Sequence, residues 1–386
     1  MQPSCVACGS SRTFDLVDID KLPVLCNELH GSRDRALNAS SGRMELRFCE
    51  SCGHYFNSAF DPALMYYSTD YETSLYASGV FRSYADDLVD RLISTYALQD
   101  KTILEIGCGR GEFLKHLCRK GGNRGIGFDT STPVEGIDPD CPGVNFVRDY
   151  FSADYDELQT DFVVCQQVLE HLESPRTFLE ELSANTTIRG SETVLYFEVP
   201  NGLYTTEHLG IWDLIYEHVS YFTPESFQRL FVGSGFEIIN AGVSFGDQYL
   251  FVEARCAPSS ITPAVIDRRE VEIAERFPEG FWSKLLKYKE RFDTETSKST
   301  MYVWGAGSKG ITFCNLIDPE GHVGGLIDRN IAKHGRFIAS TGVQIHALAD
   351  LNPADISTVV TMNPLYTGEV RSDLADCAVE AQVLPA

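Results

Sequence analysis

Four cysteines near the amino terminus have the type and spacing of metal ligands. Cys5 and Cys8 form one Cys-x-x-Cys pair, Cys49 and Cys52 form a second, and a glycine follows each pair. This spacing lets two thiolates converge on one ion, and four sulfurs complete the closed tetrahedral shell of a structural zinc. We therefore predict one structural Zn²⁺ whose binding energy helps to fold this segment. The alternative is four reduced, unpaired thiols.

A glycine-rich turn forms the second chemical element. Residues 103–114 read ILEIGCGRGEFL, a buried strand that passes through three glycines into a helix. Gly107, Gly109 and Gly111 have the spacing G-x-G-x-G, and Glu105 precedes the first glycine by two positions. A pyrophosphate favours G-x-G-x-x-G and a helix amino terminus, whereas a carboxylate beside the glycines complements the ammonium group of S-adenosylmethionine. The pattern predicts an S-adenosylmethionine site; the alternative is a generic nucleotide loop for another ligand.

A second acidic residue follows at the distance that such a site requires. The strand at 125–129 ends on Asp129, eighteen residues after Gly111. A carboxylate at the end of this strand can accept hydrogen bonds from both hydroxyls of a ribose. We therefore predict that Asp129 binds the ribose of the cofactor.

This order of elements resembles the class I S-adenosylmethionine-dependent methyltransferases, over residues 66–257. The resemblance implies that Asp149 contacts the adenine amine and that Tyr150 and Gln166 belong to the cofactor site. It also implies that the Leu-Glu-His stretch ending at His171 lies close to the methyl donor. A histidine that only caps a helix is the alternative for His171.

A polar and aromatic cluster at 212–222 contains the residues best suited to catalysis. Carbon becomes nucleophilic when a proton is removed beside a carbonyl, which requires a base near neutral pKa and a donor to the enolate oxygen. His218 can be the base, Glu217 can orient the substrate or the imidazole, and Tyr216 or Tyr221 can donate to the oxyanion. The alternative is an amphipathic segment whose aromatic residues are core.

A second glycine loop lies in the last third of the chain. Residues 301–311 read MYVWGAGSKGI, a strand followed by G-x-G-x-x-G, and Asp328 ends the next strand. Taken alone, this is a dinucleotide fingerprint and predicts an NAD-linked oxidoreductase or a ligand sensor. Lys309, Arg329 and Lys333 are candidate partners of a diphosphate, although Lys333 could equally be a solvated surface lysine.

The cysteine pairs, both glycine loops and the Glu-His pair together resemble the three-domain sugar C-methyltransferases, which act on carbon 3 of dTDP-4-keto-deoxysugars. The resemblance implies that His218 is the base, that His171 lines the substrate cleft, and that Tyr71 belongs to a substrate-lining loop. It also implies that the carboxy-terminal domain completes the sugar-nucleotide cleft without a nicotinamide. The family commonly has Tyr-His-Glu-His where this chain has Ile-Tyr-Glu-His, so Ile215 replaces its tyrosine unless Tyr216 takes over that role.

Length and charge bound the remaining possibilities. The 386 residues suffice for two or three domains, and the net charge of −23 disfavours nucleic acid and anionic lipid as partners. No apolar run is long enough to span a membrane, and the amino terminus lacks the regions of a signal peptide. Eight further cysteines are scattered singly, as in a reducing compartment. We expect a cytoplasmic protein that is a monomer or a weak homo-oligomer.

The sequence thus predicts an α/β protein with three domains. These are a zinc-binding module at 1–65, a class I methyltransferase Rossmann-like domain at 66–257, and a linker helix with a Rossmann-like substrate-binding domain at 258–386. The predicted function is S-adenosylmethionine-dependent C-methylation of a keto sugar attached to a nucleoside diphosphate. One alternative is O- or N-methylation of a glycan precursor or other small molecule. Another is an NAD-linked oxidoreductase that uses the second glycine loop.

Overall fold

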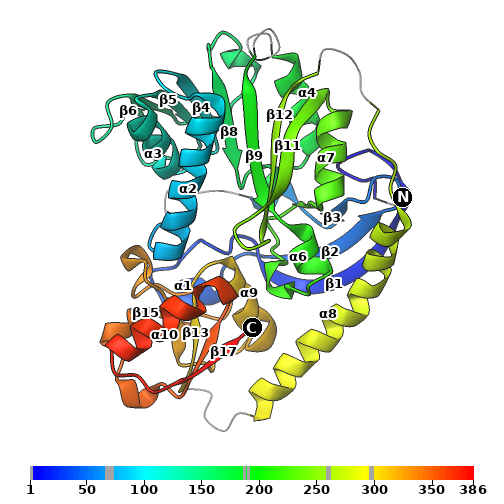
Figure 1. Cartoon of the computed structure of the whole chain (residues 1–386). Coiled ribbons are helices and arrows are strands. Elements are labelled where there is room, and N and C mark those ends of the chain that lie inside the picture. The colour runs from blue at the N-terminus through cyan, green and yellow to red at the C-terminus, as the bar shows by residue number, and fades with distance from the viewer. Residues whose placement is uncertain (1–2, 66–73, 186–187, 189–191, 258–261, 295–299) are drawn as a thin grey trace.

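The residues that the structure describes form three β-sheets with helices around them (Figure 1). The computed structural model describes residues 3–65, 74–185, 188, 192–257, 262–294 and 300–386. Tyr71, which the sequence placed in a substrate-lining loop, lies outside these residues. An amino-terminal sheet, a large central sheet and a carboxy-terminal parallel sheet correspond to the α/β class predicted from the sequence, which is confirmed.

The amino-terminal sheet is antiparallel and has the strand order β1-β2-β3-β10. Its elements are β1 (Thr13–Pro23), α1 (Arg33–Leu37), β2 (Ser41–Cys49), β3 (Tyr55–Asn57) and β10 (Ser220–Tyr221). The last strand comes from the middle of the chain and pairs Ser220 with Phe56 and Tyr221 with Tyr55. A segment of the central region is therefore fixed to the amino-terminal module by backbone hydrogen bonds.

The central sheet has the strand order β11-β12-β9-β8-β4-β5-β7-β6. Its inner strands are parallel, while β11, β12 and β6 run antiparallel to their neighbours. The strands are β4 (Thr102–Ile106), β5 (Arg124–Phe128), β6 (Gly136–Ile137), β7 (Val144–Val147), β8 (Phe162–Gln166), β9 (Val194–Pro200), β11 (Phe236–Ser244) and β12 (Tyr249–Cys256).

Helices cover both faces of this sheet, which explains why its inner strands are mostly apolar. Helices α2 (Gly79–Tyr96) and α3 (Glu112–Gly121) pack on one face, while α4 (Pro175–Ala184) and α7 (Pro224–Gly233) pack on the other. The buried residues of α2 recur at helical spacing, as Ala85, Leu88, Val89 and Leu92. The carboxyl ends of the parallel strands are left at one edge, where the first glycine loop lies.

The carboxy-terminal sheet is entirely parallel and has the strand order β15-β14-β13-β16-β17. Its elements are β13 (Met301–Trp304), α9 (Ser308–Ile317), β14 (Gly325–Ile327), β15 (Ile345–His346), β16 (Thr358–Thr361), α10 (Thr367–Asp376) and β17 (Gln382–Pro385). The 27-residue helix α8 (Arg268–Thr294) leads into this sheet and packs along β1 and α9.

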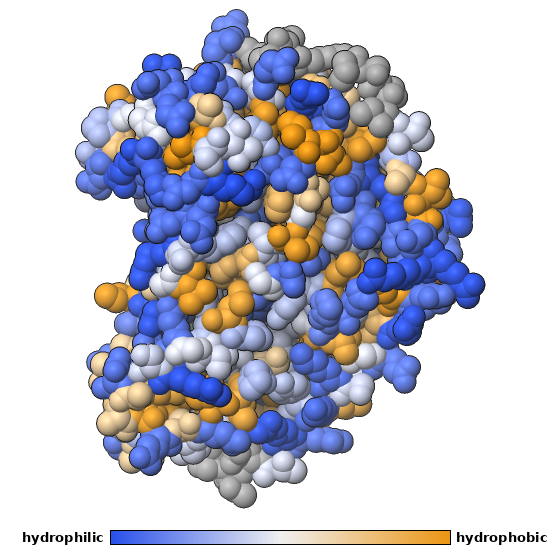
Figure 2. Space-filling view, viewed as in Figure 1, coloured by the Kyte–Doolittle hydropathy of each residue, from blue (hydrophilic) through white to orange (hydrophobic). Residues whose placement is uncertain are grey.

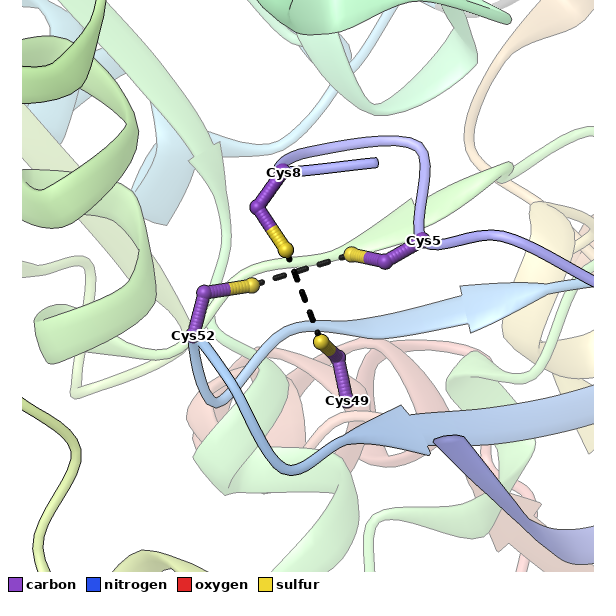
Figure 3. Close-up of side chains that lie close together, drawn as sticks. All are labelled: Cys5, Cys8, Cys49 and Cys52. Carbon is purple, nitrogen blue, oxygen red and sulfur yellow. Dashed lines mark hydrogen bonds between the residues drawn. The ribbon is translucent and has the colours of Figure 1, made fainter. Parts of the chain in front are cut away.

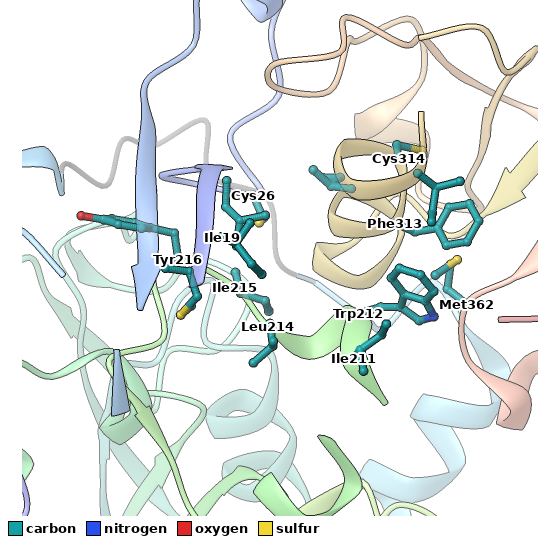
Figure 4. Packing of buried hydrophobic residues seen from close by; sticks show 14 of the residues in the cluster. Ile19, Cys26, Ile211, Trp212, Leu214, Ile215, Tyr216, Phe313, Cys314 and Met362 are labelled. Carbon is teal, nitrogen blue, oxygen red and sulfur yellow. The ribbon is translucent and has the colours of Figure 1, made fainter. Parts of the chain in front are cut away.

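One hydrophobic core joins the amino-terminal sheet to the carboxy-terminal domain. Trp212 lies within this core, and its ring centroid is 4.8 Å from that of Phe313 on α9 (Figure 4). Trp212 belongs to the segment that leads to the Glu-His pair. This packing therefore holds the catalytic candidate segment between two domains. Among the described residues, no helix is long and apolar enough to cross a membrane.

Candidate functional site

The four predicted metal ligands come together at one end of the amino-terminal sheet (Figure 3). The Sγ atoms of Cys5 and Cys52 lie 3.7 Å apart, those of Cys8 and Cys49 lie 3.6 Å apart, and all four lie within 4.8 Å of one another. A tetrahedral ion with metal–sulfur bonds of about 2.3 Å requires sulfurs about 3.8 Å apart. The side chains converge on one point in Figure 3, so this cluster has the geometry to hold a metal ion.

The first glycine loop follows β4 and opens α3. The backbone of Gly107 has φ of 74°, and a Cβ there would lie 2.1 Å from Cγ2 of Val168, so no larger residue fits. Gly109 faces open space, with no heavy atom within 4 Å of its added Cβ, and it borders the main cavity. A ligand can therefore approach the backbone at Gly109.

Asp129 braces this loop from the end of the neighbouring strand. Its Oδ2 accepts a hydrogen bond from the amide of Gly109 at 2.8 Å, and its Oδ1 accepts one from the amide of Ser131 at 2.7 Å. Oδ1 also accepts a hydrogen bond from the hydroxyl of Ser131 at 2.6 Å. Because each carboxylate oxygen can accept about two hydrogen bonds, Oδ2 retains capacity toward the cavity that Asp129 borders. Oδ2 can therefore accept a hydrogen bond from a ribose hydroxyl.

Glu105 lies beneath the loop and not in the cavity. Glu105 is 4% exposed, and its Oε2 atom is buried without a hydrogen-bond partner. Burial raises the pKa of Glu105 to about 8, although a backbone hydrogen bond from Leu114 lowers it. The carboxyl group is therefore mostly protonated at neutral pH and supports the loop from behind. Gly111 does not border the cavity either, because a ring of Phe146 packs against it.

The other predicted cofactor residues do border the cavity. Asp149 accepts a hydrogen bond from the amide of Tyr150 at 2.8 Å and another from the hydroxyl of Tyr155 at 2.8 Å. Tyr150 is exposed at the rim. Gln166 lies deeper and donates from Nε2 to Oε1 of Glu198 at 3.2 Å.

Glu198 on β9 is a cavity residue that the sequence analysis missed. It is 2% exposed, and its carboxylate accepts hydrogen bonds from the side-chain amides of Gln166 and Gln167 and from the hydroxyls of Tyr84 and Tyr196. Burial raises its pKa, although these donors lower it. A lone glutamate within an otherwise apolar strand was the available signal, since a buried carboxyl group needs such partners.

Two histidines meet in the cavity. His171 ends the 3-10 turn η3 (Leu169–His171), and its ring centroid lies 4.8 Å from that of His218 at an interplanar angle of 85°. Nδ1 of His171 lies 3.1 Å from the carbonyl oxygen of Glu217, which can only accept, so Nδ1 carries the hydrogen. Burial lowers the pKa of His171 to about 4 and lowers that of His218 well below its usual value. Both imidazoles are neutral at pH 7.

A buried carboxyl group lies beside these histidines. Glu170 is 1% exposed, borders the cavity, and has an Oε2 atom with no hydrogen-bond partner. Burial raises its pKa to about 8, so Glu170 is mostly a neutral donor at pH 7. One ligand atom each from Glu170, His171 and His218 lies within 4.8 Å of the others, so this group could alternatively hold a cation.

The amino-terminal module positions the Glu217-His218 pair. Oε1 of Glu217 accepts a hydrogen bond from the amide of Cys26 at 3.1 Å. The amide of Asn57 donates to the carbonyl oxygen of Val219 at 2.9 Å, next to the pairing of β3 with β10. The amino-terminal module therefore fixes the position of the loop that carries Glu217 and His218.

The two tyrosines predicted as oxyanion donors do not border the cavity. The hydroxyl of Tyr216 accepts from the amide of Asp61 at 2.9 Å. The hydroxyl of Tyr221 accepts from the amide of Ile215 at 2.9 Å and donates to its carbonyl oxygen at 2.9 Å. Ile215, which stands where the resembling family has tyrosine, does border the cavity. Both hydroxyls thus fix the backbone of this segment.

Lys309 and Arg329 border the cavity, but each already has acidic partners. Nζ of Lys309 lies 3.0 Å from Oδ2 of Asp213. Arg329 donates to both carboxylate oxygens of Asp373, at 2.6 Å each, and lies 2.8 Å from Oε1 of Glu369. These pairs reduce the net positive charge available to a diphosphate.

Lys333 also borders the cavity, yet it is 4% exposed and donates to the carbonyl oxygen of Ala306 at 2.9 Å. It therefore supports the second glycine loop from inside the domain, and the surface-lysine alternative raised from the sequence is wrong.

A single cavity of about 950 Å³ connects these groups, and Figure 2 shows the molecule hollowed on one side. Its walls include both glycine loops, the pair His171 and His218, and the two aspartates that follow β5 and β14, Asp129 and Asp328. The cavity is large enough to hold two ligands of nucleotide size.

Comparison with known proteins identifies the class of the central domain. Residues 76–241 match the family model described as a methyltransferase domain. Together with the parallel sheet, the glycine loop and the braced Asp129, this match defines an S-adenosylmethionine-dependent methyltransferase domain. The protein is an enzyme of that class. A search of the curated proteins gives no significant match.

Several solved structures match part of this chain. One is magnesium protoporphyrin IX methyltransferase from Synechocystis PCC 6803, at 17% identity, 48% of this chain, 89% of that chain and a TM-score of 0.35. A second is an S-adenosylmethionine-dependent methyltransferase from Mesorhizobium loti, with 13% sequence identity and a TM-score of 0.35. The match covers 46% of this chain and 100% of that chain. A third is 1,6-didemethyltoxoflavin-N1-methyltransferase from Burkholderia thailandensis, with 16% sequence identity and a TM-score of 0.34. The match covers 53% of this chain and 96% of that chain.

Proposed function

We propose that this enzyme transfers the methyl group of S-adenosylmethionine to a carbon atom beside the carbonyl of a keto sugar, and that the sugar is attached to a nucleoside diphosphate. The observation that carries the proposal is the single cavity, which is bordered by both glycine loops and contains the neutral pair His171 and His218. A methyl donor at the first loop and a nucleotide at the second would leave the sugar beside the histidines.

The first loop would hold the methyl donor. Gly109 offers its open backbone, Asp129 offers Oδ2 to the ribose, and Asp149 and Gln166 border the same cavity. S-adenosylmethionine, when bound, would supply an electrophilic methyl group, and the electrons of its C–S bond would stay on the sulfur, which would become a neutral thioether. We also propose that the four-cysteine cluster binds zinc, because its sulfur spacings match tetrahedral zinc thiolate geometry.

His218 would act as the general base. Burial keeps its imidazole neutral, so a lone pair is available to accept the proton beside the ketone. The electrons of the broken C–H bond pass into the enolate, and the enolate carbon is the nucleophile that accepts the methyl group. Glu217 is anchored by the amide of Cys26 and fixes the loop that carries the base.

Glu170 would donate a hydrogen bond to the enolate oxygen. The hydroxyls of Tyr216 and Tyr221 are committed to backbone groups. Glu170, in contrast, borders the cavity, and its buried Oε2 has no hydrogen-bond partner. Burial keeps its carboxyl group protonated at neutral pH, and a buried neutral acid is an effective donor to a developing oxyanion. Glu170 thus takes the role that the resembling family gives to a tyrosine.

Solvent deuterium exchange tests the base. The enzyme is incubated in deuterated water with S-adenosylhomocysteine and a 4-keto sugar nucleotide, and ¹H NMR follows the proton beside the ketone. Wild type should exchange this proton without methyl transfer. His218→Gln should abolish the exchange while keeping its affinity for S-adenosylhomocysteine, and His208→Gln, at an exposed histidine, is the matched control.

The variants of Glu170 separate hydrogen-bond donation from packing. Glu170→Gln keeps an N–H donor and should slow exchange less than Glu170→Ala. Wild-type exchange in His218→Gln would contradict the mechanism. So would activity that EDTA removes and Mg²⁺ restores with the cysteine-bound metal retained, because a cation at Glu170, His171 and His218 would occupy the lone pair of the base.

A further inference from the structure

The second glycine loop repeats the architecture of the first. In both domains the loop follows a strand that pairs in parallel with the next one, β4 with β5 and β13 with β14. The amide of Gly107 donates to the carbonyl oxygen of Phe128 at 2.8 Å, and the amide of Gly305 donates to that of Ile327 at 2.8 Å. Gly305 has φ of 103°, a conformation that favours glycine.

Asp328, which follows β14, makes backbone hydrogen bonds like those of Asp129, which follows β5. Oδ2 of Asp328 accepts from the amide of Ala306 at 2.8 Å, and its Oδ1 accepts from the amide of Asn330 at 2.8 Å. Asp129 likewise uses one oxygen for its glycine loop and the other for the amide two residues further on. Both aspartates border the common cavity. Each oxygen of Asp328 accepts one hydrogen bond and keeps capacity for a ligand, whereas Oδ1 of Asp129 also accepts from the hydroxyl of Ser131 and only its Oδ2 keeps capacity.

The backbone around Gly307 leaves room for a phosphate. An added Cβ at Gly307 would meet no heavy atom within 4 Å, whereas one at Gly310 would lie 2.0 Å from the carbonyl oxygen of Gly305. Helix α9 begins after Gly307, which has no side chain to cap the helix. The first backbone amides of α9 lie at the cavity wall and make no hydrogen bond to a capping side chain. The loop thus combines an open approach at one glycine with tight helix packing at another.

We propose that Asp328 binds the 2′- and 3′-hydroxyls of a ribose, so that the sugar substrate of this enzyme is carried by a ribonucleoside diphosphate and not by a deoxynucleoside diphosphate such as dTDP. The inference rests on the proposed function and narrows its substrate class. A deoxyribose offers one hydroxyl to two prepared acceptor oxygens and leaves the other unpaired. The amides at the start of α9 bind the diphosphate, because Lys309 and Arg329 already have acidic partners.

Calorimetry on the full chain, saturated with S-adenosylhomocysteine, tests this. The titrants are UDP, CDP, GDP and ADP, each with its 2′-deoxy counterpart, together with dTDP and NAD⁺. At least one ribonucleoside diphosphate should bind about 10-fold or more tightly than its deoxy counterpart. Asp328→Asn should remove most of this preference, while Asp129→Asn should weaken S-adenosylhomocysteine and leave the preference intact.

A third variant avoids the risk that Asp328→Asn disturbs folding. Gly307 has φ of −102°, which alanine adopts without strain, and its Cβ position is open. Gly307→Ala should therefore fold normally and weaken nucleotide diphosphates about 10-fold by blocking the approach of the phosphates. Unchanged affinity in this variant, dTDP binding as tightly as every ribonucleotide, NAD⁺ binding more tightly than all diphosphates, or no binding by any titrant would each overturn the inference.

The outcomes also separate this inference from the proposed function. Tight dTDP binding with methyl transfer to carbon would remove the ribose assignment and leave C-methylation standing. A ribonucleotide preference that depends on Asp328, in an enzyme that methylates oxygen or nitrogen, would do the reverse.

Discussion

Replacing Glu105 by glutamine should change how the stability of the ligand-free protein depends on pH. Burial raises the pKa of Glu105 from 4.5 to about 8, so the folded protein holds a proton that the unfolded chain releases. The unfolded state therefore binds fewer protons between these two pKa values. Stability falls as pH rises through this window, and the contribution is fully present only below pH 4.5.

The size of the effect follows from the same pKa values. One pKa unit corresponds to about 1.4 kcal/mol, so Glu105 should cost the folded state about 2 to 3 kcal/mol between pH 5.5 and 7.5. The Glu105→Gln side chain has no proton to lose in this range. Its amide lies where Oε2 has no partner, which adds a destabilisation that does not vary with pH.

Urea unfolding followed by circular dichroism, at fixed ionic strength and several pH values, measures the difference. Between pH 5.5 and 7.5, the free energy of unfolding of the wild type should fall by about 2 to 3 kcal/mol more than that of Glu105→Gln. Glu170, whose pKa is also about 8, keeps its own contribution in both proteins and cancels in the comparison. Glu275→Gln, at an exposed carboxyl group on α8, is the control. Equal slopes in wild type and Glu105→Gln would refute the reasoning.

Three further predictions concern the metal, the cofactor and the domain contact. Metal analysis should find one zinc per chain, and Cys49→Ser should lose it together with thermal stability; a variant that keeps both would contradict the zinc assignment. Asp129→Ala should weaken S-adenosylmethionine by about 1 to 3 kcal/mol in calorimetry, and undiminished affinity would rule out its ribose contact. Glu369 accepts from the amide of Gly79 at 2.7 Å and from the hydroxyl of Ser78 at 3.0 Å, so Glu369→Ala should destabilise the start of α2 by about 1 kcal/mol, seen as faster hydrogen exchange there; unchanged exchange would refute this cap.

Local patterns in the sequence predicted much of the fold. The strand, glycine loop and helix at Gly107 and at Gly305 are contiguous segments whose spacing requires a tight turn, so they could be located without the structure. The four-cysteine cluster was predictable for the same reason, because each pair is local and the two pairs need only one ion to meet.

Contacts between distant segments could not be predicted. The pairing of β10 with β3 joins residues more than 160 positions apart, and it fixes the loop of Glu217 and His218 to the amino-terminal sheet. The hydrogen bonds of the Tyr221 hydroxyl to the backbone of Ile215 were not predictable from the sequence either. The role proposed for Glu170 could not be predicted from the sequence either. This role depends on the burial of Glu170 beside two histidines and not on residue spacing.

The position of the new methyl group tests the central proposal most directly. The enzyme is supplied with S-adenosylmethionine carrying a ¹³C-methyl group and with a panel of 4-keto sugar nucleotides, and the product is examined by ¹³C NMR. We predict that the labelled methyl resonance falls at the chemical shift of a methyl group bonded to carbon, and that its protons correlate with the sugar carbon beside the former carbonyl. A product whose labelled methyl is bonded to oxygen or nitrogen would contradict C-methylation while leaving the methyltransferase domain intact.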